Sequence, residues 1–339
     1  MKNIICTGAV GFIGTNCTIE AINRGYTVYG FDNLHRPETE DNLKYLQNIY
    51  KDKFIFIHGD VRNEVDFIRL PEDTTGIIHL AGQCGIPYAQ ISPRYDFEVN
   101  ALGTLNVLEW SKTHGKVPVA FAASNKCYTN LTNELPMEET PTRYVWKDMK
   151  SINEETSLDA HGRYARSLYG TSKISGDLYC QEYWQAFGIP TVINRMSCIY
   201  GLFQKGVEEQ AWVDHFIRSI LLRDGIINIF GSKGKQVRDM LWGEDCARLY
   251  LDEIENIDKV KGKPYNIGGG IDNTMSLLEA IAEIESQTGK KATLNFEPVR
   301  HGDQTIWISD ITKIKDDLGW EPTVSPKEGI RRIIEQYSK

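Results

Sequence analysis

The sequence lacks paired cysteines and long apolar runs. Its seven cysteines occur singly, without a CxxC pair and without a histidine at metal-ligand spacing, so we expect reduced thiols, a cytoplasmic protein and no metal site. No run reaches 18 apolar residues, and the apolar stretch at the start is too short for a signal peptide. We therefore expect no membrane segment and no membrane partner.

Positive charge is also scarce. The chain has 38 Lys and Arg against 46 Asp and Glu, a net charge of −8, and its one lysine-rich stretch is short. This composition argues against a nucleic-acid partner. With 339 residues, 41% of them hydrophobic, the chain is long enough for one large domain and a smaller lobe.

Short apolar runs alternate with helical patterns in the first 200 residues. The runs are typical of buried strands, and they lie at 3–7, 27–31, 54–58, 76–80, 119–123 and 191–195. The helical patterns cover 12–24, 101–113 and 169–187. This alternation predicts an α/β fold with a doubly wound parallel sheet.

The pattern becomes less regular after residue 200. Helices are expected over 209–222 and near Ser276 and Ser325, with a glycine-rich turn at 231–234. We predict a sheet domain over 1–200, with a return of the chain near 238–265, and a smaller lobe over 201–339 that binds mainly substrate. The polar stretch 129–155 is predicted to be a long loop over a site.

A glycine turn follows the first predicted strand. Gly8, Gly11 and Gly14 form a GxxGxxG pattern that opens a helix. Glycines allow the sharp turn and the close approach of a pyrophosphate, and the helix N-terminus favours its negative charge. Phe12 and Ile13 lie in the same turn and are expected beside the ligand. An ordinary strand-to-helix turn is the alternative.

An acidic residue ends the second predicted strand. Asp32 lies 18 residues after Gly14, where a carboxylate can accept hydrogen bonds from the hydroxyl groups of the adenosine ribose. Because it would repel a 2′-phosphate, the cofactor is predicted to be NAD rather than NADP. His35 and Arg36 follow closely and could soften that preference, or could be solvated loop residues.

Further candidates follow the third and fourth strands. Asp60 is placed to reach the adenine amino group, and Leu80, Ala81 and Gln83 lie beside the expected cofactor path. Each segment alone could be an ordinary loop with no role in ligand binding. All of them fall at the carboxyl edge of the predicted sheet, however, where ligands bind.

A tyrosine and a lysine four residues apart supply candidate catalytic groups. Tyr169 and Lys173 share one face of a predicted helix. Tyrosine is a poor base at neutral pH, but a lysine cation and the positive nicotinamide ring would lower its pKa. Ser124 ends the fifth strand and could hold the reacting hydroxyl. Exposed helix residues are the alternative for the tyrosine and lysine.

Together these motifs resemble the extended short-chain dehydrogenase/reductases that modify nucleotide sugars. The resemblance spans nearly the whole chain and implies a Rossmann fold with bound NAD. It adds Asn33, Val61 and Asn100 as cofactor contacts, in the segments 32–34, 60–61 and 100–104; it also covers 236–239 and 265–269. Family members commonly pair through the Tyr–Lys helix, so a homodimer or homotetramer is expected.

The residues after Ser124 narrow the activity within that family. The 4,6-dehydratases carry an acidic pair there, and decarboxylases carry Glu, whereas this chain has Asn125 and Lys126. The chain therefore resembles an epimerase, an isomerase. The segments 79–83, 124–126, 210–213, 234–239, 298–300 and 303–304 most resemble the 2-epimerases of CDP-hexoses of the paratose and tyvelose type.

Those enzymes, which serve surface-polysaccharide biosynthesis, move a hydride from C2 of the sugar onto NAD and return it to the opposite face of a 2-keto intermediate. The resemblance makes Tyr169 the base and Ser124 the residue that positions the hydroxyl, while Lys173 holds the ribose and tunes Tyr169. It implies a substrate site made by Gln83, Ser124, Asn125, Lys126, Gln210, Arg238, Arg300 and Asp303.

Several alternatives stay open. Arg238 and Arg300 could form surface ion pairs instead of facing a diphosphate, and Trp212 could be a core residue. The segment 162–168 is longer than in the 2-epimerases and puts two arginines where the sugar should lie. A 4-epimerase or another UDP- or GDP-sugar enzyme shares the catalytic set. A non-catalytic NAD sensor would be expected to lack Tyr169 or Lys173.

Overall fold

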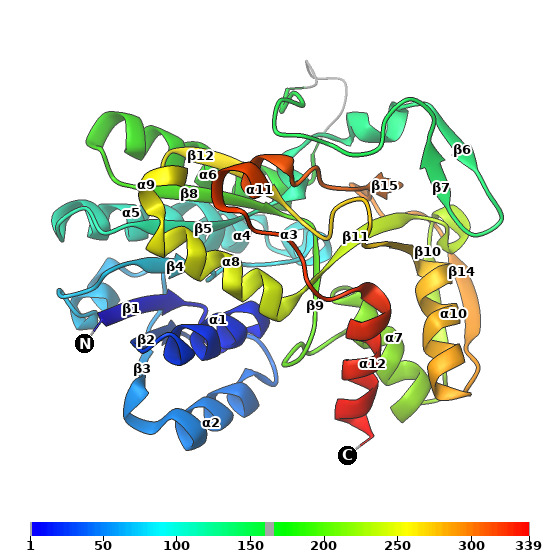
Figure 1. The fold of residues 1–339 in the computed structure, drawn as a ribbon, viewed down its shortest axis with the longest axis horizontal. Helices are drawn as coiled ribbons and strands as arrows, with labels where there is room; N and C mark the ends of the chain where they lie inside the picture. Colours follow the sequence, from blue (N-terminus) through cyan, green and yellow to red (C-terminus); the bar gives the residue numbers. More distant parts are fainter. Residues whose placement is uncertain (1, 160–165, 339) are drawn as a thin grey trace.

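The computed structural model describes residues 2–159 and 166–338. A seven-stranded sheet in which all neighbours pair parallel forms its centre (Figure 1). Its strands, in spatial order, are β12 (Lys263–Ile267), β8 (Thr191–Met196), β5 (Val119–Ser124), β4 (Ile77–His79), β1 (Lys2–Thr7), β2 (Tyr26–Asp32) and β3 (Phe54–His58). The order reverses between β1 and β4, so the predicted doubly wound α/β fold is confirmed.

Helices cover both faces of this sheet. One face carries two long helices that pack on each other, with two shorter ones beside them: α1 (Phe12–Asn23), α8 (Gly243–Glu255), α9 (Ile257–Val260) and α11 (Thr312–Leu318). Near the sheet edge lies α2 (Thr39–Tyr50). The opposite face carries α3 (Ile86–Ile91), α4 (Pro93–Phe97), α5 (Gly103–Thr113) and α6 (Leu168–Phe187).

Two apolar clusters explain this layering. The strands β1, β4 and β5 are almost completely buried, as expected for parallel strands covered on both sides. Ile4 and Ile78 face the cluster under α1 and α8, whereas Ile5 and Ile77 face the cluster under α5 and α6. Because successive side chains of a strand point to opposite faces of the sheet, each strand contributes residues to both apolar clusters.

The C-terminal part, whose helices lie on the right of Figure 1, encloses a third apolar cluster. Helices and a parallel strand pair enclose it: α7 (Trp212–Leu222), α10 (Leu277–Thr288), α12 (Pro326–Tyr337), β10 (Ile226–Phe230) and β14 (Thr293–Glu297). A small sheet joins it to the main domain through β9 (Cys198–Tyr200), β11 (Val237–Trp242), β13 (Thr274–Ser276) and β15 (Ile306–Trp307). The predicted domain boundary at residue 200 stays a prediction.

The structure corrects the predicted long loop over 129–155. This stretch contains the hairpin of β6 (Met137–Glu139) and β7 (Tyr144–Trp146). Trp146 is buried in a fourth apolar cluster, and the Arg143 guanidinium pairs with the carboxylate of Glu279 at the start of α10. The hairpin therefore packs on the C-terminal part, and the stretch contributes no residue to the two pockets described below.

The helix predicted over 101–113 begins earlier than expected. The chain is helical from Pro93, and a π-helical segment over 98–102 leads into α5. Helices around Ser276 and Ser325 are confirmed, because each serine caps a helix by accepting a backbone hydrogen bond from the residue three positions on.

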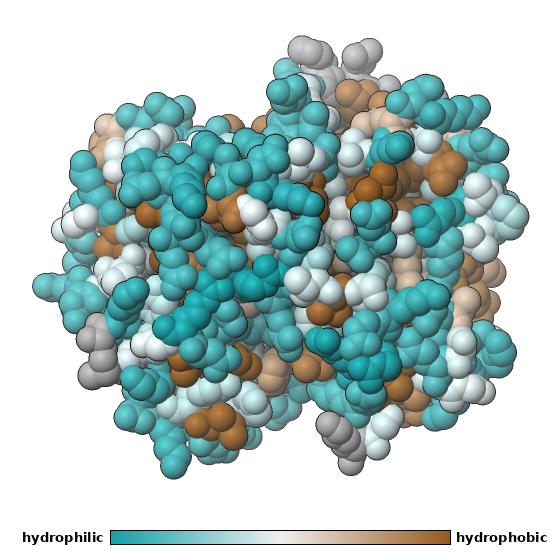
Figure 2. All heavy atoms as spheres, viewed as in Figure 1, coloured by the Kyte–Doolittle hydropathy of each residue, from teal (hydrophilic) through white to brown (hydrophobic). Residues whose placement is uncertain are grey.

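The face of the molecule in Figure 2 is mainly hydrophilic, with separate apolar patches. None of the helices in residues 2–159 and 166–338 is long and apolar enough to cross a membrane.

Candidate active site

The glycine turn connects β1 to α1 at the point where the strand order reverses. Gly8 has φ +70°, and a Cβ there would lie 2.7 Å from the backbone nitrogen of Ala81. A Cβ on Gly14 would lie 2.0 Å from the carbonyl oxygen of Gly8. No side chain caps the N-terminus of α1. The turn therefore leaves backbone amides at a helix start for a phosphate group.

Asp32 lies at the end of β2, beside this turn. Its carboxylate accepts hydrogen bonds from the backbone amides of Leu34 (2.9 Å) and Val10 (3.3 Å). Burial raises the pKa of Asp32, and these hydrogen bonds lower it in part. The carboxylate is thus fixed in orientation at the pocket wall, as a ribose acceptor requires.

Asp60 follows β3 and is part of a polar cluster. It accepts hydrogen bonds from the Arg62 guanidinium and, at 2.9 Å, from the Asn33 side chain. Burial alone would raise the pKa of Asp60, but these hydrogen bonds outweigh it and lower the pKa to about 2. Asp60 is therefore a carboxylate at neutral pH, able to accept a hydrogen bond from an amino group.

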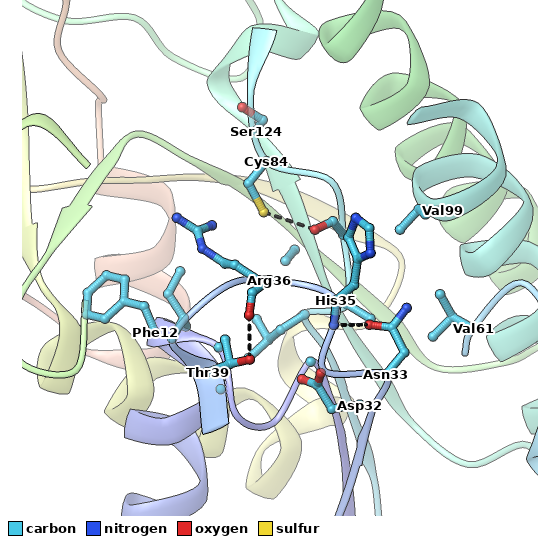
Figure 3. Close-up of a pocket in the computed structure, with 18 of the residues that line it drawn as sticks. Phe12, Asp32, Asn33, His35, Arg36, Thr39, Val61, Cys84, Val99 and Ser124 are labelled. Atoms are coloured by element: carbon cyan, nitrogen blue, oxygen red, sulfur yellow. Dashed lines mark hydrogen bonds between the residues drawn. The ribbon is translucent and has the colours of Figure 1, made fainter. Parts of the chain in front are cut away.

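These residues share one elongated pocket with the catalytic candidates. In Figure 3, Asp32 and Asn33 lie toward one end, and Ser124 and Cys84 toward the other. Fifteen of the predicted cofactor residues line it: Gly8, Gly11, Phe12, Ile13, Gly14, Asp32, Asn33, His35, Arg36, Asp60, Val61, Leu80, Ala81, Tyr169 and Lys173. The cradle around the glycines and the fixed carboxylates fit a dinucleotide such as NAD.

Two predicted cofactor residues lie outside the pocket lining. Asn100 donates hydrogen bonds to the Gln83 carbonyl, the Asp96 carboxylate and the Ser172 hydroxyl. The Gln83 side chain bonds the backbone of Gly85 in both directions. Both side chains hold the loop after β4 by hydrogen bonds and do not line the pocket. Direct contacts from them to a ligand therefore stay predictions.

The catalytic candidates come from α6 and the end of β5. Ser167 caps α6 by accepting from the backbone amide of Gly170 at 3.1 Å, which places Tyr169 and Lys173 in its first two turns. The Lys173 ammonium donates to the carbonyl of Ala122 on β5 at 2.9 Å. Ser124 ends β5 and lines the pocket with both residues. The structure therefore brings the predicted catalytic set together.

Burial opposes ionisation of both α6 groups. It raises the pKa of the Tyr169 hydroxyl, which the hydrogen bond with Ser124 partly counteracts, and it lowers the pKa of the Lys173 ammonium. A Cβ at Gly82 would lie 2.8 Å from the Lys173 nitrogen, so the lysine is tightly enclosed. Tyr169 therefore needs further positive charge beside it to act as a base.

A second pocket, of about 680 Å³, meets the first at Ser124 and Tyr169. This volume is suitable for a small-molecule ligand. It is lined by the predicted substrate residues Ser124, Asn125, Lys126, Gln210, Arg238, Arg300 and Asp303, and not by Gln83. Trp212 also lines it, and its ring packs on Phe216.

The Asp303 carboxylate organises the positive charge in this second pocket. It accepts from the Arg238 guanidinium at 2.8 Å and lies 3.7 Å from the Lys126 ammonium. Burial lowers the pKa of Lys126 to about 8, against the opposing effect of Asp303. Lys126 also donates to the carbonyl of Gly302 at 3.2 Å. Arg238 and Lys126 are therefore held at the pocket wall rather than in solvent.

The structure adds lining residues that the sequence reasoning missed. Cys84 and Gln204 line both pockets, Tyr95 lines the first beside His35, and Glu208 and Phe230 line the second. The ring centroids of His35 and Tyr95 are 5.1 Å apart. A strand-end position could have pointed to Phe230. The other four lie in loops or a short helix, where no spacing rule applies.

The long segment before Tyr169 is only partly described. Residues 162–165, including Arg163, lie outside the described residues. Arg166 donates through Nε to the carbonyl of Cys127 at 2.9 Å and through a second nitrogen to the carbonyl of Leu158. Arg166 does not line the second pocket, so its guanidinium serves the backbone and not the expected sugar position.

Known proteins resemble this chain over its full length. CDP-paratose 2-epimerase of Salmonella typhi is 36% identical, with 99% of each chain covered. A putative UDP-glucose 4-epimerase of Methanocaldococcus jannaschii is 30% identical, with 98% of this chain and 97% of that one covered. The structure of UDP-glucuronic acid 4-epimerase from Bacillus cereus, in complex with UDP-glucuronic acid and NAD, has a TM-score of 0.79 and 28% identity, with 99% of each chain covered.

The family model described as NAD dependent epimerase/dehydratase matches residues 4–268. That segment contains the glycine turn, Asp32, Ser124, Tyr169 and Lys173. The match and the NAD-bound relative confirm the predictions of an NAD cofactor and of an epimerase acting on a nucleotide sugar. By its sequence and its full-length relatives, the chain belongs to the NAD-dependent epimerase/dehydratase family.

Proposed function

We propose that this protein inverts C2 of a CDP-linked hexose through a transient 2-keto sugar. The observation that carries the proposal is the residue pair after Ser124. Asn125 and Lys126 line the substrate pocket where the reacting sugar meets the tyrosine, and neither is an acid that could assist elimination of water. The 36% identity to a CDP-paratose 2-epimerase over 99% of each chain supports C2 and the cytidine nucleotide.

The roles of the protein groups follow from their positions. Tyr169 lies where the two pockets meet and takes the proton of the C2 hydroxyl, and Ser124 beside it orients that hydroxyl. Lys173, which lines the same pocket, supplies part of the positive charge that stabilises the tyrosinate. When bound, NAD would supply a reversible hydride acceptor for C2. The keto sugar turns in the second pocket before the hydride returns to its other face, and Tyr169 returns the proton to the C2 oxygen.

The protein has a net charge of −8, so an anionic substrate needs local positive charge in the pocket that binds it. Three cations line this pocket: Lys126, Arg238 and Arg300. Arg238 is held by Asp303 at 2.8 Å, which presets its direction toward a diphosphate. Fixed cations in a partly enclosed pocket bind phosphate oxygens more strongly than mobile surface cations.

A 4-epimerase is the second candidate, favoured by the 30% identity to the putative UDP-glucose 4-epimerase over 98% of this chain. The two activities share the catalytic set and differ in the sugar carbon presented to the cofactor. A non-catalytic NAD sensor is less well supported, because the structure keeps Tyr169, Lys173 and Ser124 together at one pocket.

A panel of nucleotide hexoses separates these activities. The NAD-loaded protein is incubated with CDP-, UDP- and GDP-linked hexoses, and proton NMR follows the configurations at C2 and C4. We expect turnover of a CDP-hexose with inversion at C2 and at least about tenfold slower turnover of the other nucleotides. Inversion at C4 of a UDP-hexose would instead establish the second candidate.

We further infer a homodimer or homotetramer formed through α5 and α6. The outer side of α6 exposes Leu178 and Phe187, in keeping with a partner surface there. Sedimentation equilibrium measures this oligomeric state.

The seven cysteines are free in the structure, in keeping with a cytoplasmic location, and that location stays a prediction.

A further inference from the structure

Hydrogen bonds and ion pairs between the lining residues define the order of the substrate pocket from one end to the other. Ser124 accepts a hydrogen bond from the Lys126 backbone amide at 3.2 Å, and the Lys126 ammonium lies 3.7 Å from Asp303. Asp303 in turn holds Arg238 and lies in the field of Arg300. The series therefore runs from the catalytic end through three cations.

Arg300 forms the transition to the far end of the pocket. Its guanidinium lies 3.5 Å from the centroid of the Phe230 ring and makes long contacts of 3.4 and 3.5 Å to the backbone carbonyl of Glu208. Gln236 is 5% exposed and donates to the Phe230 carbonyl at 3.0 Å, which fixes the end of β10. Phe230 and Glu208 thus form the end of the pocket beyond the cations.

A nucleotide sugar has the same linear order of sugar, diphosphate and nucleoside. When the sugar lies at Ser124 and the diphosphate at the cations, the nucleoside reaches Phe230 and Glu208. Arg300 covers one face of the Phe230 ring, and such a stack of a planar cation on an aromatic ring has flat surfaces that suit a base. A carboxylate at this end is less expected, since it repels the nearby diphosphate unless it accepts a hydrogen bond from the ligand.

Glu208 is held in place for such a contact. The Asn228 side chain on β10 donates to one of its carboxylate oxygens, and Asn295 on β14 donates to the Asn228 oxygen at 3.1 Å, which fixes the direction of the Asn228 amide. In the described part of the chain, the structure gives the second Glu208 oxygen no partner. One carboxylate oxygen is therefore oriented by the protein and the other is left for a donor.

We propose that Glu208 selects the nucleotide by accepting a hydrogen bond from the exocyclic 4-amino group of cytosine. This inference rests on the proposed function. Cytosine and uracil differ at this position: cytosine carries an amino donor, and uracil carries a carbonyl acceptor. A carboxylate accepts from the first and repels the second, so Glu208 supplies both attraction and exclusion.

The neighbouring Glu209 is a matched control. It has the same charge and lies on the same loop at the pocket, but it is exposed. Glu208→Gln and Glu209→Gln remove the same charge from positions one residue apart. Glutamine keeps the size of the side chain, and its amide can serve either base, accepting from cytosine or donating to uracil.

The test measures the dissociation constants of CDP and UDP by calorimetry on the NAD-loaded wild type and both variants. We expect wild type to prefer CDP by about 10- to 100-fold, the range of one base-edge hydrogen bond with exclusion of the wrong base. In Glu208→Gln the preference should fall to about threefold or less, mainly because UDP binds more tightly. Glu209→Gln should keep the wild-type preference.

Other results of these titrations would reject either this inference or the proposed function. An equal loss of CDP and UDP affinity in Glu208→Gln would assign Glu208 to the ribose, and an unchanged preference would remove it from recognition; both reject this inference. Loss of preference in Glu209→Gln alone would transfer the role to Glu209 and also reject it. A wild type that prefers UDP would reject the cytidine nucleotide of the proposed function itself.

Discussion

Tyr169→Phe is expected to lower kcat by about 10³-fold and to leave NAD bound, because this change removes the group that we propose accepts the substrate proton and little else. General acid–base catalysis contributes about 10² to 10⁴ in rate. Tyr169 lies where the cofactor and substrate pockets meet, whereas the cradle for the cofactor is formed by the glycine turn. Initial-rate kinetics and the absorbance of NAD released on denaturation measure the two quantities.

Tyr179→Phe is the matched control for this change. Tyr179 lies on the same helix, ten residues further on, and is 45% exposed, so its hydroxyl has no part in the pocket and kcat should be unchanged. A Tyr169→Phe protein with normal kcat would remove Tyr169 from the role of base. If that protein loses NAD as well, the phenol binds the cofactor instead of acting only on the substrate.

The second large effect is expected at the glycine turn. Gly14→Ala places a Cβ 2.0 Å from the Gly8 carbonyl oxygen and 2.8 Å from the Ala9 Cα, and both are backbone atoms that cannot rotate away. The turn must open, which displaces the backbone amides that we propose face the phosphates of NAD. We expect NAD affinity to fall by about 10- to 100-fold, in line with overpacking costs of about 1–3 kcal/mol.

Calorimetric titration of the NAD-free proteins measures this loss, with Gly25→Ala as the control. Gly25 follows the other end of α1 with φ +88°, and a Cβ there meets nothing within 4 Å, so that variant carries local backbone strain far from the pocket. It should keep its NAD affinity at a slightly lower melting temperature. Equal NAD affinity in Gly14→Ala and wild type would contradict the proposed cradle.

Regular elements made the cofactor half of the site predictable. Parallel strands end at one edge of the sheet, so sequence positions at strand ends become neighbours in space. Gly8, Asp32, Asp60 and Ser124 each follow or end a strand, and all four line one pocket. The pair Tyr169 and Lys173 was predictable for a related reason, because four residues in a helix return to the same face.

The substrate half was harder because loops and strand positions from distant parts of the chain form it. Arg238 and Asp303 are 65 residues apart, yet form one ion pair, and Glu208 meets the end of β10 through Asn228. No helical or strand period predicts such meetings. Asn100 has a role that its motif did not indicate: its side chain ties the loop after β4 to α4 and α6, while the predicted contact with the cofactor stays a prediction.

The prediction of a loop over 129–155 failed for a different reason. Its polar composition concealed several apolar residues, among them Trp146 and Ile152, which anchor the stretch in a buried cluster. Short strands with mixed burial leave little alternation in the sequence. Cross-chain contacts, such as that of Arg143 with Glu279, then hold the hairpin in place.

Transfer of a label at C2 tests the central claim most directly. A CDP-hexose carrying deuterium at C2 is incubated with the NAD-loaded protein in ordinary water, and NMR and mass spectrometry follow both epimers. If C2 is inverted by removal and return of the same hydride, the deuterium stays at C2 in substrate and product alike. Replacement of the deuterium by solvent hydrogen during inversion, or turnover that leaves the C2 configuration unchanged, would contradict the account.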